Sequence, residues 1–71
     1  MENFETMLNS KNKSVRTFAN TILLFRNSQG FYARLYFSIC EQDKEQLQEL
    51  IKILERQNFN DSLDVVMWLE S

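Results

Sequence analysis

The chain contains no proline and a single glycine, Gly30, in its 71 residues. Proline interrupts helices and glycine supplies the positive backbone angles of tight turns, so this chain can form long helices but few sharp turns. A chain of this length buries only about 60% of its unfolded surface, which leaves a thin core. We therefore predict one small domain, residues 1–71, in which some large side chains remain at the surface.

Two helices are predicted in the N-terminal part. Asn3 is a suitable N-cap for a short first helix, and residues 9–13 are polar and without periodicity, as in a loop. Ser14 is the predicted N-cap of a second helix that extends to Arg26. The apolar residues of this second segment recur at helical spacing, on one face made of Val15, Phe18, Ala19, Ile22 and Leu23.

Residues 28–40 fit two structures. As a helix capped by Ser28, the segment places Phe31, Leu35 and Ile39 on an inner face. As a strand it alternates well between apolar and other side chains, and the preceding NSQG, residues 27–30, fits a hairpin turn. A hairpin needs two strands, however, and residues 14–26 fit a helix better than a strand. We therefore favour the helix for residues 28–40.

The C-terminal part contains the strongest helical pattern of the chain. Asp43 and Gln46 resemble a capping box, and the stripe that follows consists of Leu47, Leu50, Ile51 and Leu54. Asp61 is a suitable cap for a last helix, for which we predict an inner face made of Leu63, Val66 and Met67. Residues 62–70 also alternate as a strand would, and this remains the second interpretation.

These patterns predict an all-α domain, a small bundle of four to five helices. Its spine would be formed by the segments 14–26 and 43–57. The alternative is an α+β fold with a hairpin that turns at residues 27–30.

The side-chain inventory argues against catalysis. The chain has no histidine and one cysteine, Cys40, so it lacks the usual general base, a Cys–His or Ser–His pair, and the ligands of a zinc site. Gly30 is alone and cannot form a phosphate-binding glycine-rich loop. We expect Cys40 to be a small buried apolar residue. The sequence predicts a protein that is not an enzyme and has no catalytic residue, cofactor or metal site.

Charge is unevenly distributed. Residues 1–40 contain five basic and two acidic side chains, a balance of +3, and residues 41–71 contain eight acidic and three basic ones, a balance of −5. No apolar run approaches the roughly 18 residues of a membrane span, and the first residues do not resemble a secretion signal. We expect a cytoplasmic protein that does not enter a membrane.

Protein binding is the function that these residues favour. Tyr32, Arg34, Tyr36 and Trp68 are of the residue types that anchor interfaces, and the first three lie on the outer side of the predicted 28–40 helix. Three glutamates would share a helix face by their spacing of four, and could meet a basic groove: Glu41, Glu45 and Glu49. The alternative is a small DNA-binding regulator, because SQGFYARL has features of a helix-turn-helix recognition helix, although the turn lacks its usual glycine.

Two segments resemble short proteins of bacterial phages and integrated mobile elements: SQGFYARLY, residues 28–36, and QNFNDSLDVVMWLE, residues 57–70. Together they cover about a third of the chain. Small proteins of that setting often act by stoichiometric binding. The resemblance therefore implies an inhibitor of a host defence nuclease complex, as anti-CRISPR proteins are, or a modulator of transcription. It implies no catalytic or binding residue by itself.

Overall fold

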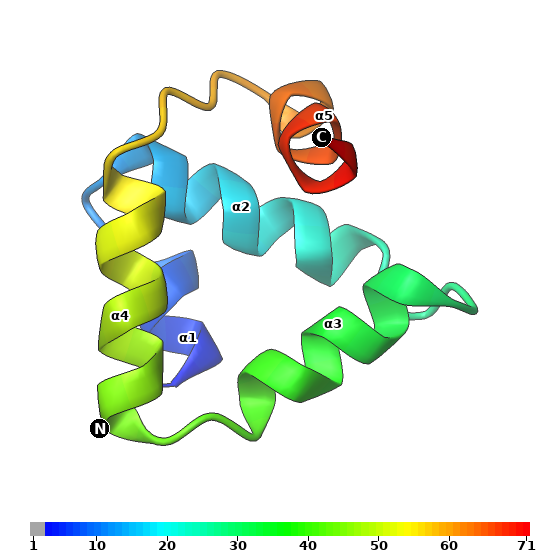
Figure 1. Cartoon of the computed structure of the whole chain (residues 1–71), viewed down its shortest axis with the longest axis horizontal. Helices are drawn as coiled ribbons and strands as arrows, with labels where there is room; N and C mark the ends of the chain where they lie inside the picture. Colours follow the sequence, from blue (N-terminus) through cyan, green and yellow to red (C-terminus); the bar gives the residue numbers. More distant parts are fainter. Residues whose placement is uncertain (1–2) are drawn as a thin grey trace.

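The computed structural model describes residues 3–71, which form five helices and no strand (Figure 1). In chain order the helices are α1 Phe4–Leu8, α2 Lys13–Leu24, α3 Phe31–Cys40, α4 Lys44–Glu55 and α5 Ser62–Glu70. The predicted all-α bundle is confirmed, and both strand alternatives, at residues 28–40 and at 62–70, are wrong. Residues 25–30 connect two helices and do not form a hairpin.

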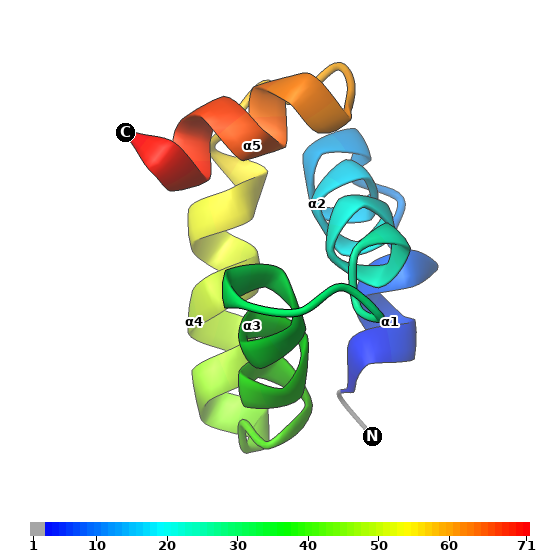
Figure 2. The ribbon, with the colours of Figure 1, turned by 90° about the vertical axis from the view of Figure 1, so that its right-hand side faces the viewer.

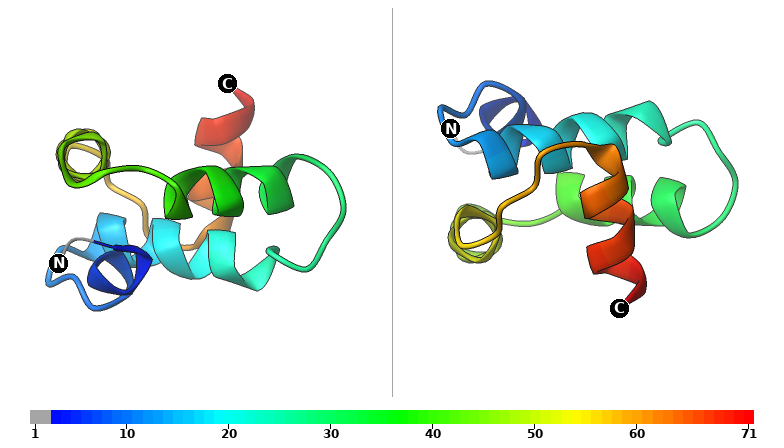
Figure 3. Two further views of the ribbon diagram at one scale, coloured as in Figure 1. Left: turned by 90° about the horizontal axis from the view of Figure 1, so that it is seen from below. Right: turned by 90° about the horizontal axis from the view of Figure 1, so that it is seen from above.

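Helix α2 lies at the centre of the arrangement. It contacts α1, α3, α4 and α5. In the view of Figure 1 it lies below α5 and above α3, and the view of Figure 2 shows both of these helices to one side of it. Seen from below and above, α3 runs alongside α2, whereas α5 crosses over it (Figure 3). The buried apolar side chains form one core cluster around α2, made of Phe4, Met7, Val15, Phe18, Ala19, Ile22, Ile39, Leu47, Leu54, Phe59 and Val65.

Three of the predicted helix caps are confirmed. Asn3 accepts a hydrogen bond from the Thr6 amide, and Asp61 accepts one from the Asp64 amide. Asp43 and Gln46 form the reciprocal capping box, in which each side chain accepts from the other residue's backbone N–H. Caps are local interactions between residues three apart, so the sequence is sufficient to identify them.

Two predicted caps are wrong. Asn12, not Ser14, caps α2 by accepting from the Val15 amide at 3.1 Å. Gly30, not Ser28, is the N-cap of α3, and it has a φ of 98°, a left-handed conformation that disfavours any side chain. Ser14 serves a different purpose, because its hydroxyl donates to the Gln57 carbonyl and accepts from the Phe59 amide.

Some predicted helix ends and faces also differ from the structure. Helix α2 ends at Leu24 and α4 at Glu55, two residues earlier than predicted in each case. On α4 the predicted inner stripe is confirmed: Leu47 and Leu54 are buried, and Leu50 and Ile51 pack against the core.

Candidate partner-binding surface

Helix α3 has one buried residue and exposes two large apolar side chains. Of its ten residues only Ile39 is buried. Phe31 and Phe37 have exposed fractions of 51% and 60%, and the exposed Arg34 lies between them. Successive spacings of three place these side chains in one row along the outer side of the helix. We call Phe31, Arg34 and Phe37 the α3 stripe.

The predicted orientation of α3 is therefore only partly correct. Leu35 and Ile39 face the core as predicted, but Phe31 does not. Tyr32 and Tyr36, which we expected on the outer side, are half-buried and pack against the core. The helix is rotated so that the tyrosines face its neighbours, and only Arg34 of the three predicted outer residues is fully exposed.

Aromatic contacts explain this rotation. The ring of Tyr36 meets Phe4 of α1 edge to face at 5.0 Å, and that of Tyr32 meets Phe25 at 5.3 Å. Each tyrosine also contacts the neighbouring stripe residue, Phe31 for Tyr32 at 5.4 Å and Phe37 for Tyr36 at 5.4 Å. The tyrosines thus hold the two exposed phenylalanine rings in place and act as supports of the surface.

Arg34 has no acidic partner among residues 3–71. Within residues 3–71 the one ion pair joins Lys52 to Glu49 on α4, at 3.8 Å, and both side chains are largely exposed. The chain has no acidic residue between Glu5 and Glu41, so the environment of Arg34 along the sequence is purely basic. A cation that lies between two exposed aromatic rings is suited to an acidic partner with apolar groups.

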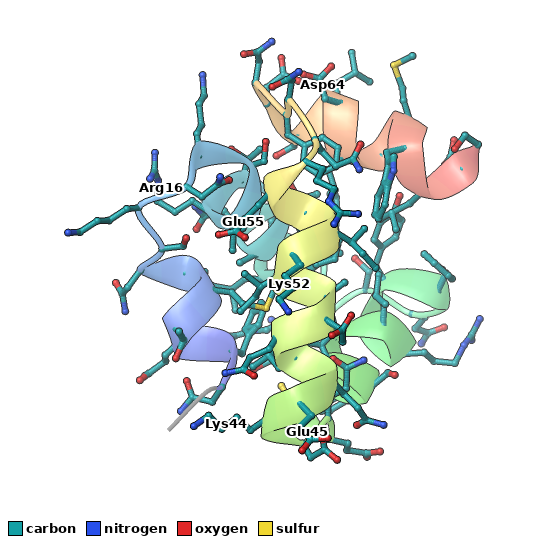
Figure 4. All side chains as sticks on the ribbon, turned by 60° about the vertical axis from the view of Figure 1, so that its left-hand side comes forward. Arg16, Lys44, Glu45, Lys52, Glu55 and Asp64 are labelled. Atoms are coloured by element: carbon teal, nitrogen blue, oxygen red, sulfur yellow. The ribbon has the colours of Figure 1, made fainter. Side chains whose placement is uncertain are left out.

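The three predicted glutamates do not form one acidic face. Glu41 is the C-cap of α3, whereas Glu45 and Glu49 lie on α4. Helix α3 ends before Glu41 and α4 starts at Lys44, so the spacing of four does not continue through one helix. All three are exposed, but Glu49 is paired with Lys52, and α4 presents acids and bases along its length (Figure 4).

Trp68 belongs to the core boundary. It lies half-buried on α5, where its ring meets Phe18 at 6.3 Å and Phe59 at 5.6 Å. The ring contacts of Trp68 are with these core residues and not with the α3 stripe. The structure therefore does not bring Trp68 together with Arg34.

A second exposed apolar row was missed at the sequence level. Leu63 and Met67 on α5, predicted as inner residues, have exposed fractions of 63% and 62%. Val65 is the buried residue of this helix, and Trp68 and Leu69 pack beside it. Val65, Trp68 and Leu69 are spaced at i, i+3 and i+4, and this spacing in the sequence indicates the inner face of α5.

A polar groove lies between α1 and α4. It has a volume of about 820 Å³, and it is lined by side chains that include Glu5, Asn9, Gln48, Lys52 and Glu55. Sites for small molecules are usually mostly apolar clefts with a few polar groups, so this open polar groove offers little to enclose one.

Cys40 and the acidic residues do not assemble into a reactive centre. Cys40 is exposed at the C-terminal end of α3, and our expectation that it is buried is wrong, because Cys40 lies about 100° around the helix from Ile39, which takes the core position. Over residues 3–71 no group of three or more Cys, Asp and Glu side chains is placed to hold a metal ion.

None of the helices in the same part of the chain is long and apolar enough to cross a membrane.

Neither protein-family models, nor curated proteins, nor solved structures provide a match to this chain. The function is therefore inferred from the surface itself.

Proposed function

We propose that this protein is a non-enzymatic protein-binding module whose α3 stripe engages a partner protein. The observation that carries the proposal is the exposure of Phe31 and Phe37 on both sides of Arg34, which forms no ion pair within the described part of the chain. Phenylalanine and arginine are both enriched in protein interfaces, and arginine is common among the residues that contribute most binding energy. The contacts with Tyr32 and Tyr36 fix the two phenylalanine rings before binding, which reduces the entropy lost on association.

The partner in this proposal is a host defence nuclease complex, inhibited by stoichiometric binding in the bacterial cytoplasm. The resemblance of two segments to phage and mobile-element proteins supports this setting, and the chain needs no catalytic group for such a role. Glu41 and Glu45 are exposed on either side of the short link between α3 and α4. They would meet basic residues of the nuclease at the edge of the contact, with Glu49 further along α4.

Affinity capture from a bacterial host tests this proposal. The tagged protein is exposed to lysate, and captured proteins are identified by mass spectrometry for wild type, Phe37→Ser and Ile53→Ser. Ile53 is an exposed apolar residue of α4 outside the α3 stripe, so its variant is the matched control. We expect capture by wild type and Ile53→Ser, and its loss in Phe37→Ser.

The captured nuclease is then assayed for cleavage while the protein is added in known molar ratio. Stoichiometric inhibition predicts that cleavage ends at about one equivalent. Equal capture by both variants, or a nuclease that stays active at saturation, would contradict the proposal.

DNA binding is the second candidate function. It is favoured by the run of five basic and no acidic side chains between residues 6 and 40. The structure reduces this support, because Arg16 donates to the backbone carbonyl groups of Ser10 and Lys11 at 2.9 and 3.1 Å. A titration with random duplex DNA at rising salt concentration tests whether the protein binds DNA, since phosphate contacts weaken steeply with salt. Absence of binding at low salt would remove this candidate.

A further inference from the structure

Helix α5 carries an exposed row that differs from the α3 stripe in charge. Leu63, Met67 and Glu70 follow one another at i, i+4 and i+7, on the side of the helix opposite the buried Val65. All three are exposed. We call Leu63, Met67 and Glu70 the α5 stripe.

The two stripes have complementary chemistry. Residues 23–40, which include the α3 stripe, contain two basic side chains, Arg26 and Arg34, and no acidic one. Residues 57–71, which include the α5 stripe, contain Asp61, Asp64 and Glu70 and no basic side chain. Each stripe thus combines exposed apolar groups with one sign of charge, and each offers the charge that the other lacks.

We propose that the α5 stripe of one copy of this chain docks on the α3 stripe of a second copy. Glu70 would pair with Arg34, and Met67 would lie against one of the phenylalanine rings of the α3 stripe, a favourable contact for its thioether. The stripes are also similar in length, because six helical steps in the α3 stripe extend about 9 Å and seven in the α5 stripe about 10.5 Å.

The position of the stripes defines the kind of assembly. Helices α3 and α5 form different edges of the molecule (Figure 1), and each stripe lies on the side of its helix away from the residue that this helix buries, Ile39 on α3 and Val65 on α5. A contact between two different patches of a subunit is heterologous, so in a head-to-tail assembly it leaves a free stripe at each end. Assembly therefore continues head to tail and does not stop at a dimer.

This inference rests on the proposed function, since it names an occupant of the same α3 stripe. A second copy and a foreign partner would compete for Arg34 and its two phenylalanines. Self-assembly then controls how much of the α3 stripe is free for the partner.

Molecular mass at rising concentration tests the inference. It is measured by sedimentation equilibrium at low salt, and in reducing buffer because Cys40 is exposed. We expect the wild-type mass to rise from the chain mass of 8.5 kDa to more than twice that value. Added salt should lower it, because the exposed Arg34–Glu70 pair is screened.

Two variants separate the stripes. Arg34→Glu/Phe37→Ser removes the α3 stripe, and Met67→Ser/Glu70→Lys removes the α5 stripe. Each variant alone should remain a monomer at every concentration, with an unchanged circular dichroism spectrum. Their mixture should form a dimer and nothing larger, because the single intact stripe of each variant finds its counterpart on the other. The chain with both Arg34→Glu and Glu70→Lys should assemble again.

Several outcomes would overturn the inference. A wild type that stays monomeric at millimolar concentration would show that the stripes do not attract each other, and one that stops at a dimer would contradict the open head-to-tail assembly. A mixture of the two variants that does not pair would exclude the α3–α5 contact.

Failure of the proposed function is detected separately. Met67→Ser/Glu70→Lys keeps the α3 stripe, so it should capture the foreign partner from lysate at least as well as wild type. Capture without self-assembly would reject only the inference, and self-assembly without capture would reject only the proposed function.

Discussion

At the scale of single residues, Ser14 connects parts of the chain that are far apart in sequence. Its side chain is buried, and its hydroxyl donates to the Gln57 carbonyl at 2.6 Å and accepts from the Phe59 amide at 3.0 Å. These bonds attach the first turn of α2 to the segment between α4 and α5. They satisfy two backbone groups that belong to no helix ladder there.

The change Ser14→Ala should therefore destabilise the protein. It leaves the buried Phe59 amide without its partner, and an unsatisfied buried group costs about 1–3 kcal/mol. Unfolding in urea measures the difference. Ser38→Ala is the matched control, since Ser38 is exposed on α3 and alanine has the higher helix propensity. If Ser14→Ala were no less stable than this control, the bridging role of the hydroxyl would be refuted.

At the scale of elements, α3 is attached to the molecule by few buried groups. Ile39 is its only buried residue, supported by Tyr32, Leu35 and Tyr36 at the core boundary. A helix with so little buried surface should open at a lower free energy than α2, which buries six residues. The same lack of burial leaves the α3 stripe free for a partner.

Two substitutions on α3 should differ in their effect on the free energy of unfolding. Ile39→Ala removes a core side chain and should cost about 2–5 kcal/mol. Phe37→Ala removes an exposed ring and should change the free energy of unfolding by no more than about 0.5 kcal/mol. Urea unfolding of both variants checks this. A large loss of stability in Phe37→Ala would mean that the ring belongs to the core and not to a binding surface.

At the scale of the whole molecule, stability depends on α2. Its side chains Phe18, Ala19 and Ile22 are fully buried, and the other four helices all pack against it. A domain of 71 residues has a total stability of roughly 4–11 kcal/mol, at about 0.05–0.15 kcal/mol per residue. The loss of one large side chain from α2 is comparable with that total.

Phe18→Ala should consequently unfold much of the population, since replacement of a buried phenylalanine by alanine costs about 3–5 kcal/mol. Circular dichroism at the helical minimum measures the remaining structure. Leu24→Ala, in the same helix but at a residue that is 70% exposed, should leave the spectrum unchanged. The central role of α2 would be disproved if the two variants were equally folded.

The amino-acid sequence by itself determined the features that depend on neighbours along the chain. The scarcity of glycine and proline and the apolar spacing of residues 47–54 indicated helices, and the caps at Asn3, Asp43 and Asp61 followed from bonds across three residues. Arg34 was correctly placed at the surface, because a lone charge is not buried without a partner.

Only the tertiary structure decided which sides of α3 and α5 face outward. Both helices carry apolar residues around most of their circumference, so periodicity alone allowed several orientations. The choice was made by contacts with distant rings: Phe4 and Phe25 turn the tyrosines of α3 inward, and Phe18 and Phe59 do the same for Trp68. With those sides filled, Phe31 and Phe37 on α3 and Leu63 and Met67 on α5 remain in solvent, because so small a core has no further room.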